Sequence, residues 1–367
     1  MKLEAVELRR VSIPLREPWR TAHGVLYERD VLLVRALTDG AEGWGECGAL
    51  SEPGYSPEWV DGAAEVLRRW LVPGVVGTDV NAEDVGPRCA SIPGHQMAKA
   101  ALETAVLDAE LRNAGLSLAA FLGATRNRVP AGVAVGFIEP LPALLATVER
   151  FVTEGYARVK LKIAPGHDLG IVGAVRKRFP HIALQVDANG AYSPDEMDAL
   201  VALDPFDLLL LEQPFPPDDL LAHAALARRA RTPVCLDESI VSADSARVAL
   251  ALGACSVVNI KAPRVGGVLE ARRIHDLCVA ADVPVWCGGM LETGIGRALN
   301  VALAALPGFT LPGDLSASDR YYERDLTEPF VLDDGCLNVP TGAGIGVVPN
   351  ADVLLELTTS VETITAD

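Results

Sequence analysis

Short apolar runs recur through the middle of this chain at intervals of about 25 residues, and this repeat constrains the fold more than any other feature. Segments rich in Ala, Leu and Arg separate the runs and have the composition of helices. Near-continuous hydrophobic strands that alternate with helices are typical of parallel strands with helices packed over them. Eight such units predict a closed (β/α)8-type barrel. The runs span residues 132–135, 158–162, 182–187, 206–212, 233–237, 256–261, 284–288 and 309–311.

Both ends of the chain depart from this period. Residues 3–13 and 30–38 alternate between apolar and polar side chains, which predicts antiparallel strands, and residues 95–114 are dense in Ala and Leu, which predicts a helix. The eighth run is short and no ordinary helix follows it, so we expect a modified last barrel unit. The predicted parts are an α+β capping domain over residues 1–125, the barrel over 126–320, and a C-terminal segment over 321–367 that returns to the capping domain; the alternative for this segment is a tail.

Charge and cysteine usage exclude several classes of function. The formal net charge is −17, with 49 acidic against 32 basic residues, so nucleic acid and anionic membranes are poor partners. No apolar stretch is long enough to cross a bilayer, and the N-terminus lacks the apolar region of a signal peptide. The seven cysteines include no CxxC pair, which predicts buried, reduced thiols rather than metal ligands. We therefore expect a soluble, cytoplasmic chain.

Three carboxylates end three consecutive apolar runs. Asp187, Glu212 and Asp237 follow one another at 25-residue intervals. Side chains at the carboxyl ends of barrel strands point into one active site, where three acids would raise one another's pKa. A divalent cation removes that cost, and an all-oxygen donor set predicts Mg²⁺, with Mn²⁺ as the substitute, rather than zinc. The alternative is that each acid is a solvated charge at the end of its strand. This explains a single acid better than three acids at equal intervals.

Lysines flank these acids on both sides. Lys160 and Lys162 are two residues apart on the second run, so both ammonium groups face the same side of the strand, and Lys261 ends the sixth run. Two neighbouring ammonium groups are expected to lower each other's pKa, which would let one of them act as a general base. The apolar neighbours Val159 and Leu161 argue against exposed lysines. A metal with a lysine on each face predicts abstraction of a proton α to a carboxylate.

The KxK pair, the three acids and Lys261 resemble the enolase superfamily in its muconate-lactonizing branch, a site type known to combine a Lys or His base with Mg²⁺. Further motifs make the chain similar to the group of o-succinylbenzoate synthases and N-acylamino acid (N-succinylamino acid) racemases. The resemblance covers essentially the whole chain, and it implies a small carboxylate substrate; we also expect a homo-oligomer. The motifs are Trp44-Gly45-Glu46, Ser51-Glu52-Pro53-Gly54-Tyr55-Ser56, Asp237-Glu238-Ser239, Asn259-Ile260-Lys261 and the GGMLETGIG stretch at 288–296.

The resemblance implies a chemical role for each lysine. Lys162 corresponds to the general base, and in a dehydration it also protonates the departing hydroxyl group. Lys160 corresponds to its electrostatic partner. Lys261 would stabilise the enolate from the opposite face, or act as the second acid/base in a racemisation. The three acids correspond to the metal ligands.

Other positions are implied to support the site or bind substrate. Asn189 would support the ligands without binding the metal; the alternative is a turn residue before Gly190. An arginine at position 264 resembles the members that also racemise; the alternative for Arg264 is a charge at the rim. Backbone N–H groups near Gly289 and Met290 would bind the distal succinyl carboxylate, since glycine allows close approach.

The first domain is expected to close the barrel mouth. Segments 16–25 and 50–57 would be mobile capping loops that exclude water and contact the substrate through Trp19 and Tyr55; the alternative is ordinary packing of these two aromatics. Ala134 stands where the family commonly has a serine, which puts one polar substrate contact in doubt.

The leading hypothesis is a Mg²⁺-dependent o-succinylbenzoate synthase, a syn-dehydrating lyase of menaquinone biosynthesis. The alternative in the same site is an N-succinylamino acid racemase, and both reactions begin with the same proton abstraction. A non-catalytic binding barrel that kept its metal is a hypothesis of a different class. The intact set of lysines and acids argues against it.

Overall fold

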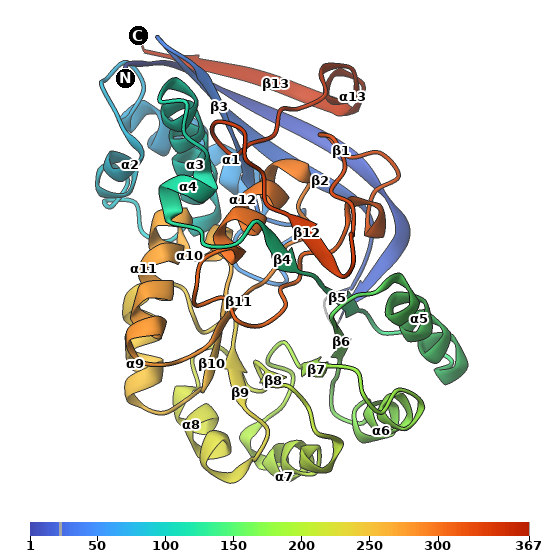
Figure 1. The fold of residues 1–367 in the computed structure, drawn as a ribbon. Helices are drawn as coiled ribbons and strands as arrows, with labels where there is room; N and C mark the ends of the chain where they lie inside the picture. Colours follow the sequence, from blue (N-terminus) through green and yellow to red (C-terminus); the bar gives the residue numbers. More distant parts are fainter. Residues whose placement is uncertain (22–23, 367) are drawn as a thin grey trace.

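A curled parallel sheet forms the centre of the computed structural model, which describes residues 1–21 and 24–366 (Figure 1). Its seven strands follow one another in chain order, as consecutive βα units predict. The helices of these units surround the strands in Figure 1. The strands are β5 (Gly132–Val135), β6 (Arg158–Lys162), β7 (Leu184–Asp187), β8 (Leu211–Glu212), β9 (Val234–Leu236), β10 (Val257–Ile260) and β11 (Val285–Cys287).

The eighth barrel position is filled without a strand. Phe309 forms an isolated parallel bridge to Val285 of β11, and Gly313 forms another to Ala131 beside β5, so this stretch links the two edge strands. Pro312 lacks the backbone N–H that a ladder needs, which explains why pairing stops at single bridges. The predicted (β/α)8-type barrel is confirmed with a modified last unit, and the expected strand over 309–311 is reduced to one bridge.

Most barrel helices bury one stripe of side chains, whereas the short α10 is buried throughout and α12 nearly so. In α5, Leu144, Val148 and Phe151 face the core at helical spacing. Helix α12 is buried along nearly its whole length, because it lies between the barrel and strand β3 of the capping domain. The helices are α5 (Leu141–Glu154), α6 (Leu169–Arg178), α7 (Met197–Val201), α8 (Leu220–Arg229), α9 (Ala243–Ala251), α10 (Ala262–Val265), α11 (Val268–Ala280) and α12 (Gly294–Ala304), with short turns η3 (Pro194–Glu196), η4 (Asp204–Phe206) and η5 (Ser318–Arg320).

An antiparallel sheet of order β13-β1-β2-β3 caps the barrel. Strand β13 pairs with β1 (Val6 opposite Ile364), so the end of the chain joins its beginning, and Figure 1 shows both at the top of the molecule. Helix α3 packs closely on β3: a Cβ at Gly43 would lie 2.2 Å from Ala105 O. The elements are β1 (Leu3–Thr21), β2 (Gly24–Thr38), β3 (Glu42–Cys47), α1 (Val60–Val66), η1 (Leu67–Leu71), η2 (Val72–Gly74), α2 (Ala82–Arg88), α3 (Gln96–Asn113), α4 (Leu118–Leu122), β4 (Arg128–Pro130), β12 (Cys336–Asn338), α13 (Ala351–Leu357) and β13 (Thr358–Thr365).

One expected capping loop is regular structure. Residues 16–21 continue β1 and residues 24–25 begin β2, with Trp19 opposite Leu26, so the described part of segment 16–25 is a long hairpin rather than a loop. Residues 22 and 23 lie outside the described residues. The second expected loop, over 50–57, contains neither helix nor strand.

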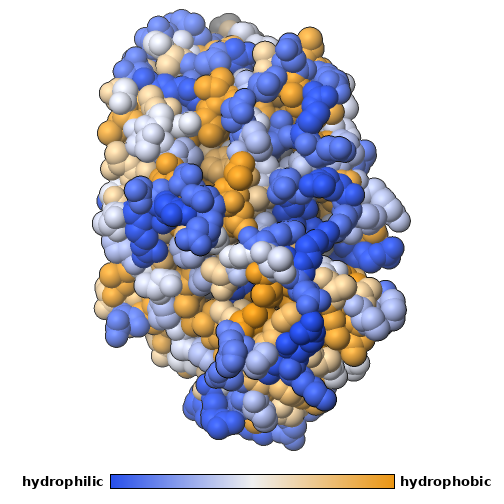
Figure 2. All heavy atoms as spheres, turned by 45° about the vertical axis from the view of Figure 1, so that its right-hand side comes forward, coloured by the Kyte–Doolittle hydropathy of each residue, from blue (hydrophilic) through white to orange (hydrophobic). Residues whose placement is uncertain are grey.

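The surface mixes hydrophilic and apolar side chains. Figure 2 shows one face on which hydrophilic residues are interspersed with apolar ones. Large exposed apolar side chains such as Leu221 and Leu355 are scattered along the chain. In residues 1–21 and 24–366, no helix combines the length and the apolar character needed to cross a membrane.

Candidate active site

The strand register brings predicted site residues into one row. Lys162 is the register partner of Asp187, and Asp187 is the partner of Glu212, across β6, β7 and β8. Glu212 in turn pairs with Cys235 of β9, two residues before Asp237. Because the strands are parallel, these side chains meet at the carboxyl end of the sheet.

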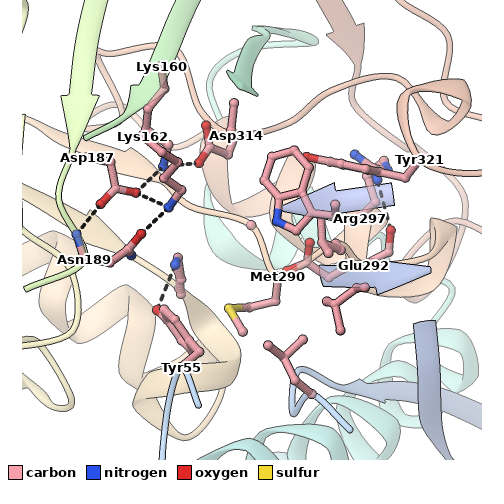
Figure 3. A pocket seen from close by; sticks show the side chains of 17 residues that line it. Tyr55, Lys160, Lys162, Asp187, Asn189, Met290, Glu292, Arg297, Asp314 and Tyr321 are labelled. Carbon is pink, nitrogen blue, oxygen red and sulfur yellow. Dashed lines mark hydrogen bonds and ion pairs between the residues drawn. The ribbon is translucent and has the colours of Figure 1, made fainter. Parts of the chain in front are cut away.

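A pocket of about 800 Å³ opens at this end of the sheet (Figure 3). Three of the predicted residues, Glu212, Asp237 and Arg264, lie beneath its wall. The other predicted residues all line it: Trp19, Tyr55, Lys160, Lys162, Asp187, Asn189, Lys261, Gly289 and Met290. The wall is completed by Leu26, Leu50, Ala134, Leu291, Glu292, Arg297, Asp314 and Tyr321.

Lys160 lies at the centre of a buried ionic cluster. Its Nζ is 3.3 Å from Asp187 Oδ2, 3.0 Å from Glu212 Oε2 and 2.5 Å from Asp314 Oδ2. Burial alone lowers the pKa of this ammonium, but the three carboxylates outweigh burial and hold the pKa of Lys160 well above its usual value. The expectation that Lys160 and Lys162 lower each other's pKa considered the second ammonium and a metal, and it left out these carboxylates around Lys160.

Lys162 is held by two residues of the β7 strand end. Its Nζ donates to Asp187 Oδ2 at 2.7 Å and to Asn189 Oδ1, and the dashed lines in Figure 3 mark both contacts. Asn189 Nδ2 in turn donates to Glu238 Oε1 at 2.8 Å. Asn189 has a φ of +44°, so it has the backbone of a turn residue and also contacts a lysine of the site.

Lys261 and Arg264 share one carboxylate on the other side of the pocket. Lys261 Nζ donates to Asp237 Oδ2 at 2.8 Å, and Arg264 Nη1 donates to Asp237 Oδ1. Burial alone raises the pKa of Asp237, but Arg264 and Lys261 hold this pKa well below its usual value. Arg264 is buried, with 5% of its surface exposed, which excludes a position at the rim.

Tyr55 brings the capping domain into direct contact with this side. Its hydroxyl accepts hydrogen bonds from Lys261 Nζ at 2.8 Å and Arg264 Nη1 at 3.1 Å, and it lies 3.3 Å from Asp237 Oδ2. Segment 50–57 therefore covers the barrel mouth at this point.

The three acids have the donor chemistry of a site for a hard divalent cation. Asp187, Glu212 and Asp237 are fully buried and offer only oxygen. Burial and the neighbouring Asp187 raise the pKa of Glu212 to about 8, an unfavourable state that a bound cation relieves. In residues 1–21 and 24–366, no three His, Cys, Asp or Glu side chains are drawn together at metal-binding spacing. The three carboxylates instead form ion pairs with lysines and an arginine. Their oxygen atoms are the donor type that Mg²⁺ prefers, but they are spaced as carboxylates held in ion pairs.

Sequence reasoning missed Asp314 as a site residue. Its carboxylate accepts from Arg158 Nη1 at 2.7 Å and Lys160 Nζ at 2.5 Å, and it lines the pocket. A weaker signal was present: Asp187 ends the third apolar run, and Asp314 lies three residues after the eighth. Because the predicted run ended at residue 311, before Pro312 and Gly313, Asp314 was not recognised as a residue at the end of a strand.

The backbone of the loop after β11 offers free donors to the pocket. Within the described part of the chain, the N–H groups of Gly289 and Met290 have no protein acceptor. Across the pocket, Trp19 packs edge-to-face on Tyr321, with ring centroids 5.8 Å apart. Trp19 therefore packs against an aromatic and also lines the pocket.

Two family models match almost the whole chain. The N-terminal domain of mandelate racemase and muconate lactonizing enzyme matches residues 4–123, and the enolase C-terminal domain-like family matches residues 143–353. The chain belongs to the enolase superfamily. The resemblance inferred from the lysines and acids is thereby confirmed.

Named relatives within the enolase superfamily show which of its members this chain is similar to. The chain is 57% identical over 362 residues, 98% of both chains, to a protein from Amycolatopsis sp. named N-succinylamino acid racemase. It is 44% identical over 368 residues, 100% of this chain and 99% of the other, to a Bacillus subtilis protein named o-succinylbenzoate synthase. A solved Listeria innocua structure described as a member of the enolase superfamily superposes with a TM-score of 0.96 at 39% identity, covering 100% of both chains.

Proposed function

We propose that this enolase-superfamily protein is an o-succinylbenzoate synthase that removes water from its substrate after abstracting a proton α to a carboxylate. The observation that carries the proposal is the placement of Lys162 and Lys261 on opposite sides of one pocket, since β6 and the end of β10 face each other across the curled sheet. The full-length likeness to o-succinylbenzoate synthases supports it.

Asp187, Glu212 and Asp237 would hold Mg²⁺, and a bound ion stabilises negative charge that develops on the substrate carboxylate. Lys162 Nζ takes the α-proton, and the electrons of the C–H bond move into the enolate. The same ammonium then protonates the hydroxyl on the same face, which leaves as water as the C–O bond breaks. Lys261 stabilises the enolate from the other face.

Racemisation of N-succinylamino acids is the second candidate activity. The 57% identity to a protein of that name favours it. The geometry also suits it, because a racemase must remove a proton on one face and return it on the other, and Lys162 and Lys261 lie on opposite sides of the pocket. Free N–H groups at Gly289 and Met290 suit a distal succinyl carboxylate, and Trp19 and Tyr55 would contact the rest of the substrate.

We also propose that the chain divides into a capping domain (1–125), a barrel (126–320) and a returning segment (321–367). It is supported by the pairing of β13 with β1. Homo-oligomeric state and cytoplasmic location stay predictions of the sequence.

The experiment that tests the proposal measures two reactions of the purified protein with Mg²⁺ present. The first is dehydration of the hydrated precursor of o-succinylbenzoate, followed by absorbance. The second is exchange of the α-proton of N-succinylamino acids in D₂O, followed by NMR. The proposal expects dehydration. Exchange without dehydration would make racemisation the main activity. If the protein catalyses neither reaction, the hypothesis of a non-catalytic binding barrel remains.

Replacement of Arg264 by glutamine is expected to impair racemisation more than folding. Arg264 neutralises Asp237 beside Lys261, so its loss leaves Lys261 as the remaining cation on that carboxylate and ties this lysine more tightly to it. We expect kcat for racemisation to fall about tenfold to a hundredfold, with a smaller loss in dehydration, where Lys261 transfers no proton. Steady-state kinetics of both reactions test this. Unchanged kinetics for both would limit Arg264 to a structural role.

A further inference from the structure

A glutamate of the capping domain holds the first turn of a barrel helix. Glu46 on β3 is buried, and its Oε1 accepts from Thr293 N at 3.1 Å. Its Oε2 accepts from the Thr293 hydroxyl at 2.7 Å and from Gly296 N at 2.9 Å. The carboxylate therefore pairs otherwise free N–H groups at the start of α12 and faces the positive end of its dipole. A Cβ at Gly296 would lie 3.0 Å from Glu46 Oε2, so the fit is close.

The residues just before this turn form a wall of the substrate pocket. Gly289, Met290, Leu291 and Glu292 all line the pocket, and Figure 3 labels Met290 and Glu292. Leu291 has a φ of +60°, a backbone conformation that is unfavourable for a bulky side chain and persists only when the surroundings enforce it.

Hydrogen bonds from both sides enforce this conformation. Tyr322 OH donates to Leu291 O, and Arg297 Nη2 donates to Glu292 O at 2.9 Å. Both of these bonds act on carbonyl groups of the loop. Glu46 accepts hydrogen bonds from Thr293 and Gly296 at its end, and these bonds reach the loop from the β3 strand of the capping sheet.

We propose that Glu46 is a positioning residue for substrate binding, which sets the conformation of loop 289–293 and thereby aims the N–H groups of Gly289 and Met290 at the distal carboxylate of the substrate. The inference rests on the proposed function, because it concerns how the same pocket binds that substrate. The loop contacts a part of the substrate that does not react, so it binds ground state and transition state alike. Losing its conformation weakens substrate affinity more than turnover.

The chain contains a matched control for this proposal. Glu103 on α3 is also a buried glutamate of the capping domain, and it accepts from Leu269 N at 3.2 Å in the first turn of barrel helix α11. Burial raises the pKa of Glu46 and of Glu103 to about 7 in both cases. The two residues thus share chemistry and burial, but Glu103 holds a helix whose first turn does not line the pocket.

The test compares Glu46→Gln with Glu103→Gln. An amide accepts through one oxygen only, so Glu46→Gln leaves a buried N–H of Thr293 or Gly296 without an acceptor. We expect KM for the hydrated precursor of o-succinylbenzoate in the dehydration assay, and for an N-succinylamino acid if the protein exchanges its α-proton, to rise about tenfold to a hundredfold, with kcat changed less than about threefold. Glu103→Gln should lower the melting temperature about as much as Glu46→Gln does, but it should leave KM within about twofold of the wild-type value.

Two further variants cover the case in which Glu46→Gln does not fold. Thr293→Val keeps both backbone bonds to Glu46 and removes the hydroxyl bond, and it should raise KM about threefold to tenfold. Thr293→Ser restores the hydroxyl and should restore KM. If KM of Glu46→Gln and of Thr293→Val stays within twofold of the wild type, or if Glu103→Gln raises KM as much, the positioning role is wrong.

Amide hydrogen exchange separates this proposal from the proposed function. It needs no substrate, and it should show faster exchange at Thr293 and Gly296 in Glu46→Gln than in Glu103→Gln. Faster exchange in a protein that catalyses neither reaction would overturn the proposed function and the substrate-binding role, and would leave only the contact between Glu46 and the loop. Unchanged exchange at these two amides would overturn the contact itself.

Discussion

Replacement of Lys162 by alanine is expected to lower the rate of dehydration by about 10⁴-fold or more, because this one side chain removes the α-proton as a neutral amine and then, as the ammonium, protonates the departing hydroxyl. Lys160, its neighbour, is held by Asp187, Glu212 and Asp314, which keep its pKa high and leave it protonated. Single-turnover kinetics of the hydrated precursor, with Mg²⁺ saturating, measure the effect.

Lys177→Ala is the matched control for this prediction. Lys177 is an exposed lysine near the end of α6, so its removal tests the loss of a lysine away from the pocket. Its rate should equal that of the wild type. A Lys162→Ala protein that folds and keeps more than about a tenth of the wild-type rate would place the base elsewhere, since a general base contributes at least 10²-fold.

Removal of the metal is expected to have the second-largest effect. A chelator should lower both reactions by about 10³-fold or more, and Mg²⁺ should restore them, because stabilisation of the enolate by a divalent cation is worth several kcal/mol. Asp237→Asn should weaken Mg²⁺ binding in calorimetric titration, since it removes one of three buried carboxylates.

Asp314→Asn is the control for the metal prediction. Asp314 is also a carboxylate of the pocket, but it is paired with Arg158 and Lys160 and lies outside the proposed ligand set. It should keep Mg²⁺ affinity. Full affinity in Asp237→Asn, or a greater loss in Asp314→Asn, would show that the ligand set has been chosen wrongly.

The sequence predicted the barrel and the row of strand-end residues because both depend on local pattern. An apolar run ending in an acid places that acid at the carboxyl end of a strand. Equal spacing then brings Lys162, Asp187 and Glu212 into register. The eighth unit was harder to predict, because Pro312 interrupts the strand pattern and separated Asp314 from its apolar run.

Features that depend on tertiary contacts could not be predicted from the sequence. The pKa of Lys160 depends on three carboxylates from three separate segments, and no spacing along the chain shows their distances. Residues 16–21 contain Pro18 and charged side chains typical of a loop, yet they continue β1, and residues 19–21 pair with β2. The role of Glu46 could not be predicted either, because the N–H group of Gly296 in α12 that donates to it lies 250 residues away in the sequence.

The most direct test of the central claim, that two lysines face the substrate from opposite sides, is exchange of the α-proton of each enantiomer of an N-succinylamino acid in D₂O. Lys162→Ala and Lys261→Ala are measured with each enantiomer separately. The account predicts that each variant retains exchange with only the enantiomer whose α-proton points at the remaining lysine, and that Lys261→Ala also loses about 10²- to 10³-fold in dehydration through poorer enolate stabilisation. Equal exchange of both enantiomers by both variants would contradict the opposed-lysine geometry.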